Sequence, residues 1–157
     1  MVKFISYLTI LLFTQNGINV NNTSSSIDKY IGLSAELNRD TVYADSTFIL
    51  TVVFENKTDS CIKFYPKAVL SIVRPSGGFE YDSYFLNKAL NLREESEIAP
   101  HATHKETFKV HAKPPVFKKG MNYLHLYYLC KEQRGDFKKY NKLYGSLESD
   151  EFRIFIK

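Results

Sequence analysis

One stretch of the chain, residues 47–55, constrains the fold more than any other because its side chains alternate in character. Phe48, Leu50, Val52 and Phe54 occupy one parity, and the other parity mixes threonine and glutamate with Ile49 and Val53. A β-strand with this pattern has one buried face. Because an apolar face of this length must be covered, a second layer of secondary structure is required.

The same alternation, separated by turn-forming residues, predicts strands through the rest of the chain. Turn residues at 56–60 and renewed alternation at 62–64 predict a β-hairpin with the first strand. The aromatic content of 15%, from 12 Phe and 11 Tyr, also favours pleated structure. The predicted strands cover residues 30–37, 47–55, 62–64, 69–74, 79–85, 107–111, 122–130 and 149–157.

These strands predict an all-β protein with one domain over residues 28–157. A chain of 157 residues buries an adequate core without a second domain. The expected architecture is a two-layer antiparallel β-sandwich of about seven to nine strands.

The N-terminus is typical of an export signal. Lys3 is followed by an apolar run over residues 4–13, about half of the roughly 20 residues that a membrane-spanning helix needs. Residues 1–25 are therefore predicted to be a signal peptide with a polar spacer, and the protein to be secreted or periplasmic, with no stable membrane insertion after cleavage. The alternative is that the run forms an apolar first strand or a short buried helix.

The overall charge excludes a dedicated nucleic-acid binder. The formal net charge is +4, from 21 basic and 17 acidic residues, which is too balanced for such a protein, whose basic residues would be expected in stripes or one-sided patches. The expected partner is therefore an unidentified protein or glycan.

The order of features along residues 33–129 carries a resemblance to a known family. In sequence, it comprises a strand with Leu50 and Val52, an Asn-Lys-Thr turn at 56–58, a strand ending in Phe-Tyr-Pro at 64–66, Ile-Ala-Pro-His at 98–101 and a strand from 120. This layout resembles secreted bacterial immunoglobulin-like β-sandwich domains, including the intracellular proteinase inhibitor family of bacilli. The resemblance implies an immunoglobulin-like sandwich and carries over no binding residue.

Two cysteines, Cys61 and Cys130, are compatible with a disulfide in an exported protein. In an immunoglobulin-like sandwich, the strand that Cys61 begins and the strand that Cys130 ends would be antiparallel neighbours. A bond between them would add about 2–4 kcal/mol of stability by the chain-entropy model. Two separate thiols are the alternative, since Cys61 shares its parity with the outward Lys63 and Cys130 shares its parity with the inward Tyr128.

Neither an enzyme nor a cofactor is predicted. No Gly-x-Ser-x-Gly turn is present, and the paired acidic residues lie in polar turns. His101, His104 and His111 fall in one segment, but opposite parities at His104 and His111 argue against a shared metal. Asn56 heads an Asn-Lys-Thr glycosylation sequon that matters only in a eukaryotic source.

The segment 131–147 is the predicted binding site. It interleaves cations with aromatic residues, which are the side chains that dominate interface hot spots, and long loops on rigid sandwiches commonly carry function. The predicted binding residues are Arg134, Phe137, Lys138, Lys139, Tyr140 and Tyr144. We therefore predict a binding module that engages a protein or glycan through this loop. The alternative is a proteinase inhibitor or immunity-type protein that uses an extended loop at 114–120.

Overall fold

The alternating segment forms strand β3 (Thr47–Asn56), the middle strand of a three-stranded antiparallel sheet. Its apolar parity lies in the core, with Leu50, Val52 and Phe54 fully buried. Strand β1 (Ile31–Leu37) pairs with one edge of β3, and β8 (Thr103–His111) pairs with the other. The structure, a computed structural model, describes residues 29–65, 68–75, 81–87, 95–130 and 145–157.

A second, six-stranded sheet is built around β9 (Gly120–Cys130), whose residues alternate in the same way. Its strand order is β2 (Thr41–Val42), β11 (Phe152–Ile156), β9, β5 (Val69–Pro75) and β6 (Tyr81–Asn87), and β10 (Gly145–Glu148) pairs with the remaining part of β9. All of these pairings are antiparallel except that between β11 and β2.

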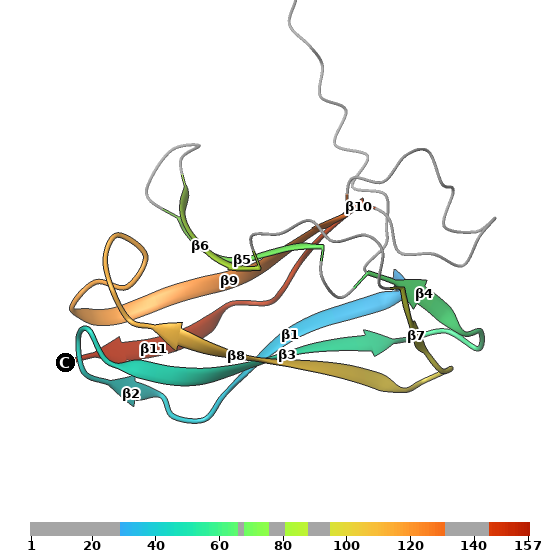
Figure 1. The fold of residues 1–157 in the computed structure, drawn as a ribbon, viewed down its shortest axis with the longest axis horizontal. Coiled ribbons are helices and arrows are strands. Elements are labelled where there is room, and N and C mark those ends of the chain that lie inside the picture. Colours follow the sequence, from blue (N-terminus) through green and yellow to red (C-terminus); the bar gives the residue numbers. More distant parts are fainter. Residues whose placement is uncertain (1–28, 66–67, 76–80, 88–94, 131–144) are drawn as a thin grey trace, which may run out of the picture.

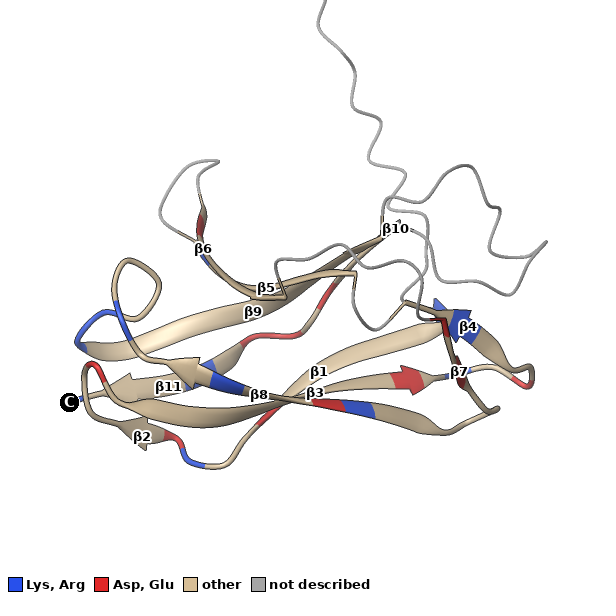
Figure 2. Ribbon diagram, viewed as in Figure 1, with Lys and Arg blue, Asp and Glu red and all other residues tan. Residues whose placement is uncertain are grey.

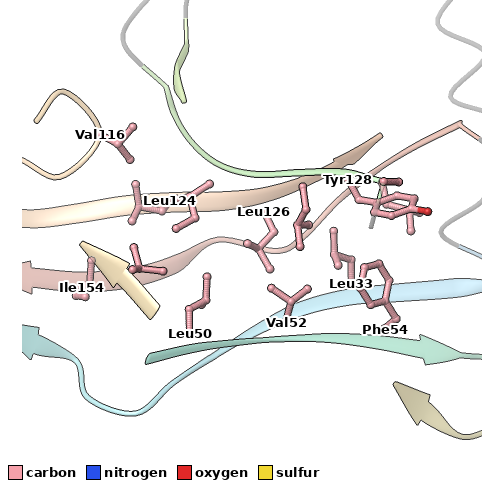
Figure 3. Packing of buried hydrophobic residues seen from close by; sticks show 14 of the residues in the cluster. Leu33, Leu50, Val52, Phe54, Val116, Leu124, Leu126, Tyr128 and Ile154 are labelled. Atoms are coloured by element: carbon pink, nitrogen blue, oxygen red, sulfur yellow. The ribbon is translucent and has the colours of Figure 1, made fainter. Parts of the chain in front are cut away.

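The two sheets lie over one another and share one core (Figure 1). Side chains of β1 and β3 point toward those of β9 and β11, with Leu50 and Val52 facing Leu126 and Ile154 (Figure 3). The expected all-β class and the need for a covering layer are therefore confirmed. None of the described residues lies in an α-helix.

A third sheet pairs β4 (Ile62–Phe64) with β7 (Ser96–Ile98). The predicted hairpin between residues 47–55 and 62–64 is therefore wrong, since β4 does not pair with β3. The physical reason is that β1 and β8 already occupy both edges of β3, so β4 finds its hydrogen-bonding partner elsewhere.

The described part of the chain contains eleven strands, more than the seven to nine that alternation predicts. The extra ones are short pieces, β2, β7 and β10, in which two to four residues are too few to display a period. The strand predicted at residues 149–157 begins later, at Phe152.

The predicted disulfide is also wrong, because no bond joins Cys61 to Cys130. Cys61 is exposed, and its Sγ lies 3.6 Å from Oε2 of Glu97, whereas Cys130 is buried at the end of β9. The neighbours of β9 are β5, β10 and β11, so β4, which follows Cys61, lies in a different sheet.

We expect the two thiols to react separately with iodoacetamide. Cys61 should label in the native protein, and Cys130 only after denaturation, as mass spectrometry of tryptic peptides would report. Desolvation and the Glu97 carboxylate raise the pKa of the Cys61 thiol. Because thiolate is the reactive form, the rate should keep rising at pH values where an ordinary thiol has levelled off. A urea midpoint that falls on addition of reductant would contradict this arrangement.

The predicted leader, residues 1–25, lies outside the described residues, so secretion remains an expectation. In the part of the chain that the structure describes, there is no long apolar helix of the kind that spans a bilayer.

Candidate functional site

The outer faces of the two large sheets differ in chemistry. On the three-stranded sheet, the positions between the buried residues of β3 lie opposite Lys105, Thr107 and Lys109 of β8. Lys105 Nζ lies 2.9 Å from both carboxylate oxygens of Glu36 on β1. Figure 2 shows charged positions on β3 and β8. This face is a solvated surface.

The outer face of the six-stranded sheet is apolar and aromatic instead. Strand β9 carries no Lys, Arg, Asp or Glu along its length (Figure 2). Most of the large apolar side chains that are exposed in the described residues belong to this face; they are Tyr81, Phe85, Met121, Tyr123 and Phe155. A monomeric surface rarely concentrates apolar groups in this way, so the face is a candidate for recognition.

The face contains a hollow of about 420 Å³ over β5, β6, β9 and the end of β10. Ser71 and Val73 form its floor, because they are only 3% and 8% exposed although they lie on the side of β5 opposite to the core residues Leu70 and Ile72. The residues that line this hollow, called the outer groove below, are Val69, Ser71, Val73, Tyr81, Ser83, Phe85, Tyr127, Leu129 and Glu148.

Polar contacts hold the β10 end of the outer groove in place. His125 Nδ1 lies 3.1 Å from the carbonyl oxygen of Ser149 and 3.6 Å from Oε1 of Glu148. The Ser149 hydroxyl accepts a hydrogen bond from the Leu126 N–H at 2.8 Å and donates to the Asp150 carbonyl at 2.7 Å. The residues that line the groove include no histidine or cysteine, and most of them are apolar or aromatic.

The clustered histidines do not converge. His101 Nε2 lies 2.8 Å from Asp59, His104 Nε2 lies 2.9 Å from Glu106, and His111 contacts a backbone carbonyl. Within the described ranges, no three residues among His, Cys, Asp and Glu lie close enough to hold a metal ion.

The predicted binding residues Arg134, Phe137, Lys138, Lys139, Tyr140 and Tyr144 lie outside the described residues. The predicted loop extends too far, however, because residues 145–147 belong to strand β10. Gly145 pairs with Cys130, so the two ends of segment 131–144 meet at one end of the β9–β10 pair. Tyr127, Leu129 and Glu148 of the same pair line the outer groove.

The structure does not place residues 114–120 in an extended loop. Val116 and Phe117 are each 1% exposed and lie in the core, with the Phe117 ring centroid 5.6 Å from that of Phe48. Asn122 holds the turn closed, since its Oδ1 accepts the Lys118 N–H at 2.9 Å. A loop that blocks a protease exposes successive side chains, so the geometry of this turn does not favour the inhibitor interpretation.

The sequence analysis overlooked the outer groove, although one signal was available. The predicted strand at 122–130 has apolar residues on both parities, because Tyr127 and Leu129 alternate with the core residues Leu126 and Tyr128. A strand with a solvated outer face would carry polar residues at those positions.

No protein-family model and no curated protein matches the sequence. Solved structures with partial similarity include the alkylpurine DNA glycosylase AlkC of Pseudomonas fluorescens, at 9% identity and a TM-score of 0.45, covering 82% of this chain and 30% of that one. The sporulation control protein Spo0M of Bacillus subtilis has 12% identity and a TM-score of 0.46, with 82% and 49% covered. Superoxide reductase (neelaredoxin) from Ignicoccus hospitalis has 15% identity and a TM-score of 0.42, with 85% and 86% covered. Similarity at this level supports no argument about function.

Proposed function

We propose that this chain is a secreted or periplasmic binding module that holds an apolar or aromatic group of a protein or glycan in the outer groove. The observation that carries the proposal is the contrast between the two outer faces. One has charged residues along β3 and β8 and a Lys105–Glu36 ion pair, and the other, although Arg153 and Glu148 lie on it, has a 420 Å³ hollow with mainly apolar walls. Keeping such a surface exposed costs solubility, and binding of a partner would compensate for that cost.

An immunoglobulin-like sandwich is the architecture that we propose for this module. In that fold, the second strand of the chain lies between the first and the fifth in one sheet, and the third, sixth and seventh strands form the other. If the short strands are set aside, the order β1-β3-β8 opposite β11-β9-β5-β6 is compatible with it. The similarity of strand order concerns the scaffold alone.

Segment 131–144 adds a second element to the proposal. The described residues that flank it, Cys130 and Gly145, pair with each other on the same two strands that supply Tyr127, Leu129 and Glu148 to the groove, which is why we include this segment in the proposal. The segment would then extend the contact area, and its Arg134, Phe137 and Tyr140 are residue types that favour interfaces.

The test is a titration of isotope-labelled protein, followed by amide chemical shifts in NMR spectra. The probes are short peptides and soluble β-linked oligosaccharides. A ligand of the module should shift the amides of Tyr127 and Leu129 and leave those of β3 and β8 unchanged. Phe85→Ser should weaken binding by about tenfold or more, because a buried aromatic contact contributes at least about 1.4 kcal/mol.

Ile49→Ser is the matched control, because Ile49 is 36% exposed on the outer face of the other sheet. This variant should bind each probe as the wild type does. The proposal is rejected if no probe of either class shifts the groove amides, or if both variants weaken binding equally.

A further inference from the structure

Strand β6 is the last strand of its sheet, so one of its edges carries backbone groups with no neighbouring strand. The hydrogen bonds of β9 show which residues of β6 carry those groups. The Leu126 carbonyl accepts the Ser149 N–H at 3.0 Å, and the Leu126 N–H donates to Ser149 Oγ. Both backbone groups of Leu126 therefore face away from β5. Since Leu126 lies opposite Ile72, the backbone groups of Ile72 are directed to the other side, toward β6.

Ile72 of β5 lies opposite Tyr84 of β6, and these two residues form a hydrogen-bonded pair. In an antiparallel pair, hydrogen-bonded and non-hydrogen-bonded positions alternate. Ser83 and Phe85 therefore direct their N–H and C=O groups away from β5. No backbone hydrogen bond to either residue is present at this edge among the described residues.

A second hollow, of about 250 Å³, lies along this edge, and we call it the edge groove. Ser83, Tyr84 and Phe85 are consecutive, and consecutive side chains in a strand point to opposite faces. A hollow that touches all three must therefore run along the backbone edge. Its other wall is formed by Lys113, Pro114, Pro115 and Val116.

The two hollows meet at β6, because Ser83 and Phe85 line both. An extended chain beside the edge would place alternate side chains on the outer face, above the apolar outer groove, and the others toward the 113–116 wall. This is the geometry of β-strand addition, in which backbone hydrogen bonds supply affinity and alternate pockets supply specificity.

The charges around the edge groove indicate what its inward side chains would be. Lys113 lines the edge groove and has no ion pair in the described part of the chain. The carboxylate of Asp82 on β6 lies 3.8 Å from Lys118 Nζ, away from Lys113 in the sequence. The 113–116 wall of the edge groove therefore has a positive charge, that of Lys113, which complements an acidic side chain.

We propose that the module binds an extended peptide segment by strand addition to β6, with apolar residues over the outer groove and acidic residues toward Lys113. This inference rests on the binding function proposed above and narrows its partner to a polypeptide. A glycan offers no alternating N–H and C=O groups to Ser83 and Phe85.

The probe is a synthetic peptide of alternating Val and Glu, compared with an alternating Val and Lys peptide and with a Val and Glu peptide that is N-methylated at alternate residues. Hydrogen exchange followed by NMR should show that the Val and Glu peptide slows exchange of the Ser83 and Phe85 amides. Lys113→Glu should weaken binding of the Val and Glu peptide by about tenfold and strengthen binding of the Val and Lys peptide.

Ser83→Pro should also weaken binding by about tenfold or more, because it removes an outward N–H that bonds nothing in β5. Ser83→Ala keeps that N–H and should bind normally. If Ser83→Pro does not fold, the N-methylated peptide and Lys113→Glu test the same contact.

The outcomes separate the two proposals. Protection of Ser83 and Phe85 together with the charge swap supports strand addition. If peptides leave these amides unprotected while an oligosaccharide shifts Tyr127 and Leu129, strand addition is overturned and the binding function stands. If no probe affects either groove, both fail.

Discussion

Replacing Asn56 by aspartate should lower the free energy of unfolding by about 3–5 kcal/mol, because the change leaves a buried carboxylate facing carbonyl oxygens. Asn56 is 0% exposed. Its Nδ2 donates to the carbonyl oxygens of Ser60, Ile98 and Ala99 at 2.8, 3.0 and 3.0 Å. Its Oδ1 accepts from the N–H and hydroxyl of Thr58. Aspartate keeps the acceptor and loses every donor.

This residue ties three parts of the fold together, namely the end of β3, the turn before β4 and the end of β7. The side-chain amide therefore acts as a clamp between the three-stranded and the two-stranded sheets. Its burial also leaves no accessible amide for glycosylation at this sequon. Equilibrium urea denaturation, monitored by circular dichroism, would measure the loss.

Asn38→Asp is the matched control, since the Oδ1 of Asn38 accepts the Ile49 N–H at 2.9 Å at an exposed position. Aspartate retains that acceptor, so we expect a change within about 0.5 kcal/mol. Equal losses at positions 38 and 56 would show that the amide at 56 is not the clamp described here.

The second large effect is expected for Phe54→Ala, with a loss of about 3–5 kcal/mol in the free energy of unfolding. Phe54 is 0% exposed. Its ring centroid lies 5.1 Å from that of Phe64 on β4 and 5.3 Å from that of Tyr128 on β9. Figure 3 shows Phe54 beside Tyr128. One side chain therefore contacts both other sheets, and its removal leaves a cavity where all three meet.

Phe155→Ala provides the comparison, because Phe155 has the same side chain but is 39% exposed on the outer face. Here we expect a loss below about 1 kcal/mol, measured by the same denaturation experiment. If Phe54→Ala is no more destabilising than Phe155→Ala, the three sheets do not depend on a common core at this point.

Pairing was harder to predict than strand formation. Alternation located β3 and β9 and their buried residues, because burial of every second side chain can be recognised from neighbouring residues alone. It could not show that β4 pairs with β7, since a turn at 56–60 looks the same whichever strand follows it in space. The disulfide prediction failed for the same reason, because it assumed that the strand after Cys61 is a neighbour of β9.

The candidate site was likewise predictable in its local residues and not in how the strands bring them together. Tyr127 and Leu129 could be read as apolar on the outward parity, but their meeting with Val73 and Phe85 required three strands to lie side by side. Likewise, the open edge at Ser83 and Phe85 depends on β6 being the terminal strand. The loop residues 134–144 could be chosen by composition alone, and they remain a prediction.

The sequence by itself determined that this chain is all-β, which residues are buried in its long strands and where most strands end, because these properties depend on side chains a few positions apart. Only the tertiary structure decided which strands are neighbours, which face retains apolar residues and which backbone edge stays open. Those properties depend on contacts between distant segments, and the free energy of such contacts is set by the whole arrangement of sheets and not by any local pattern.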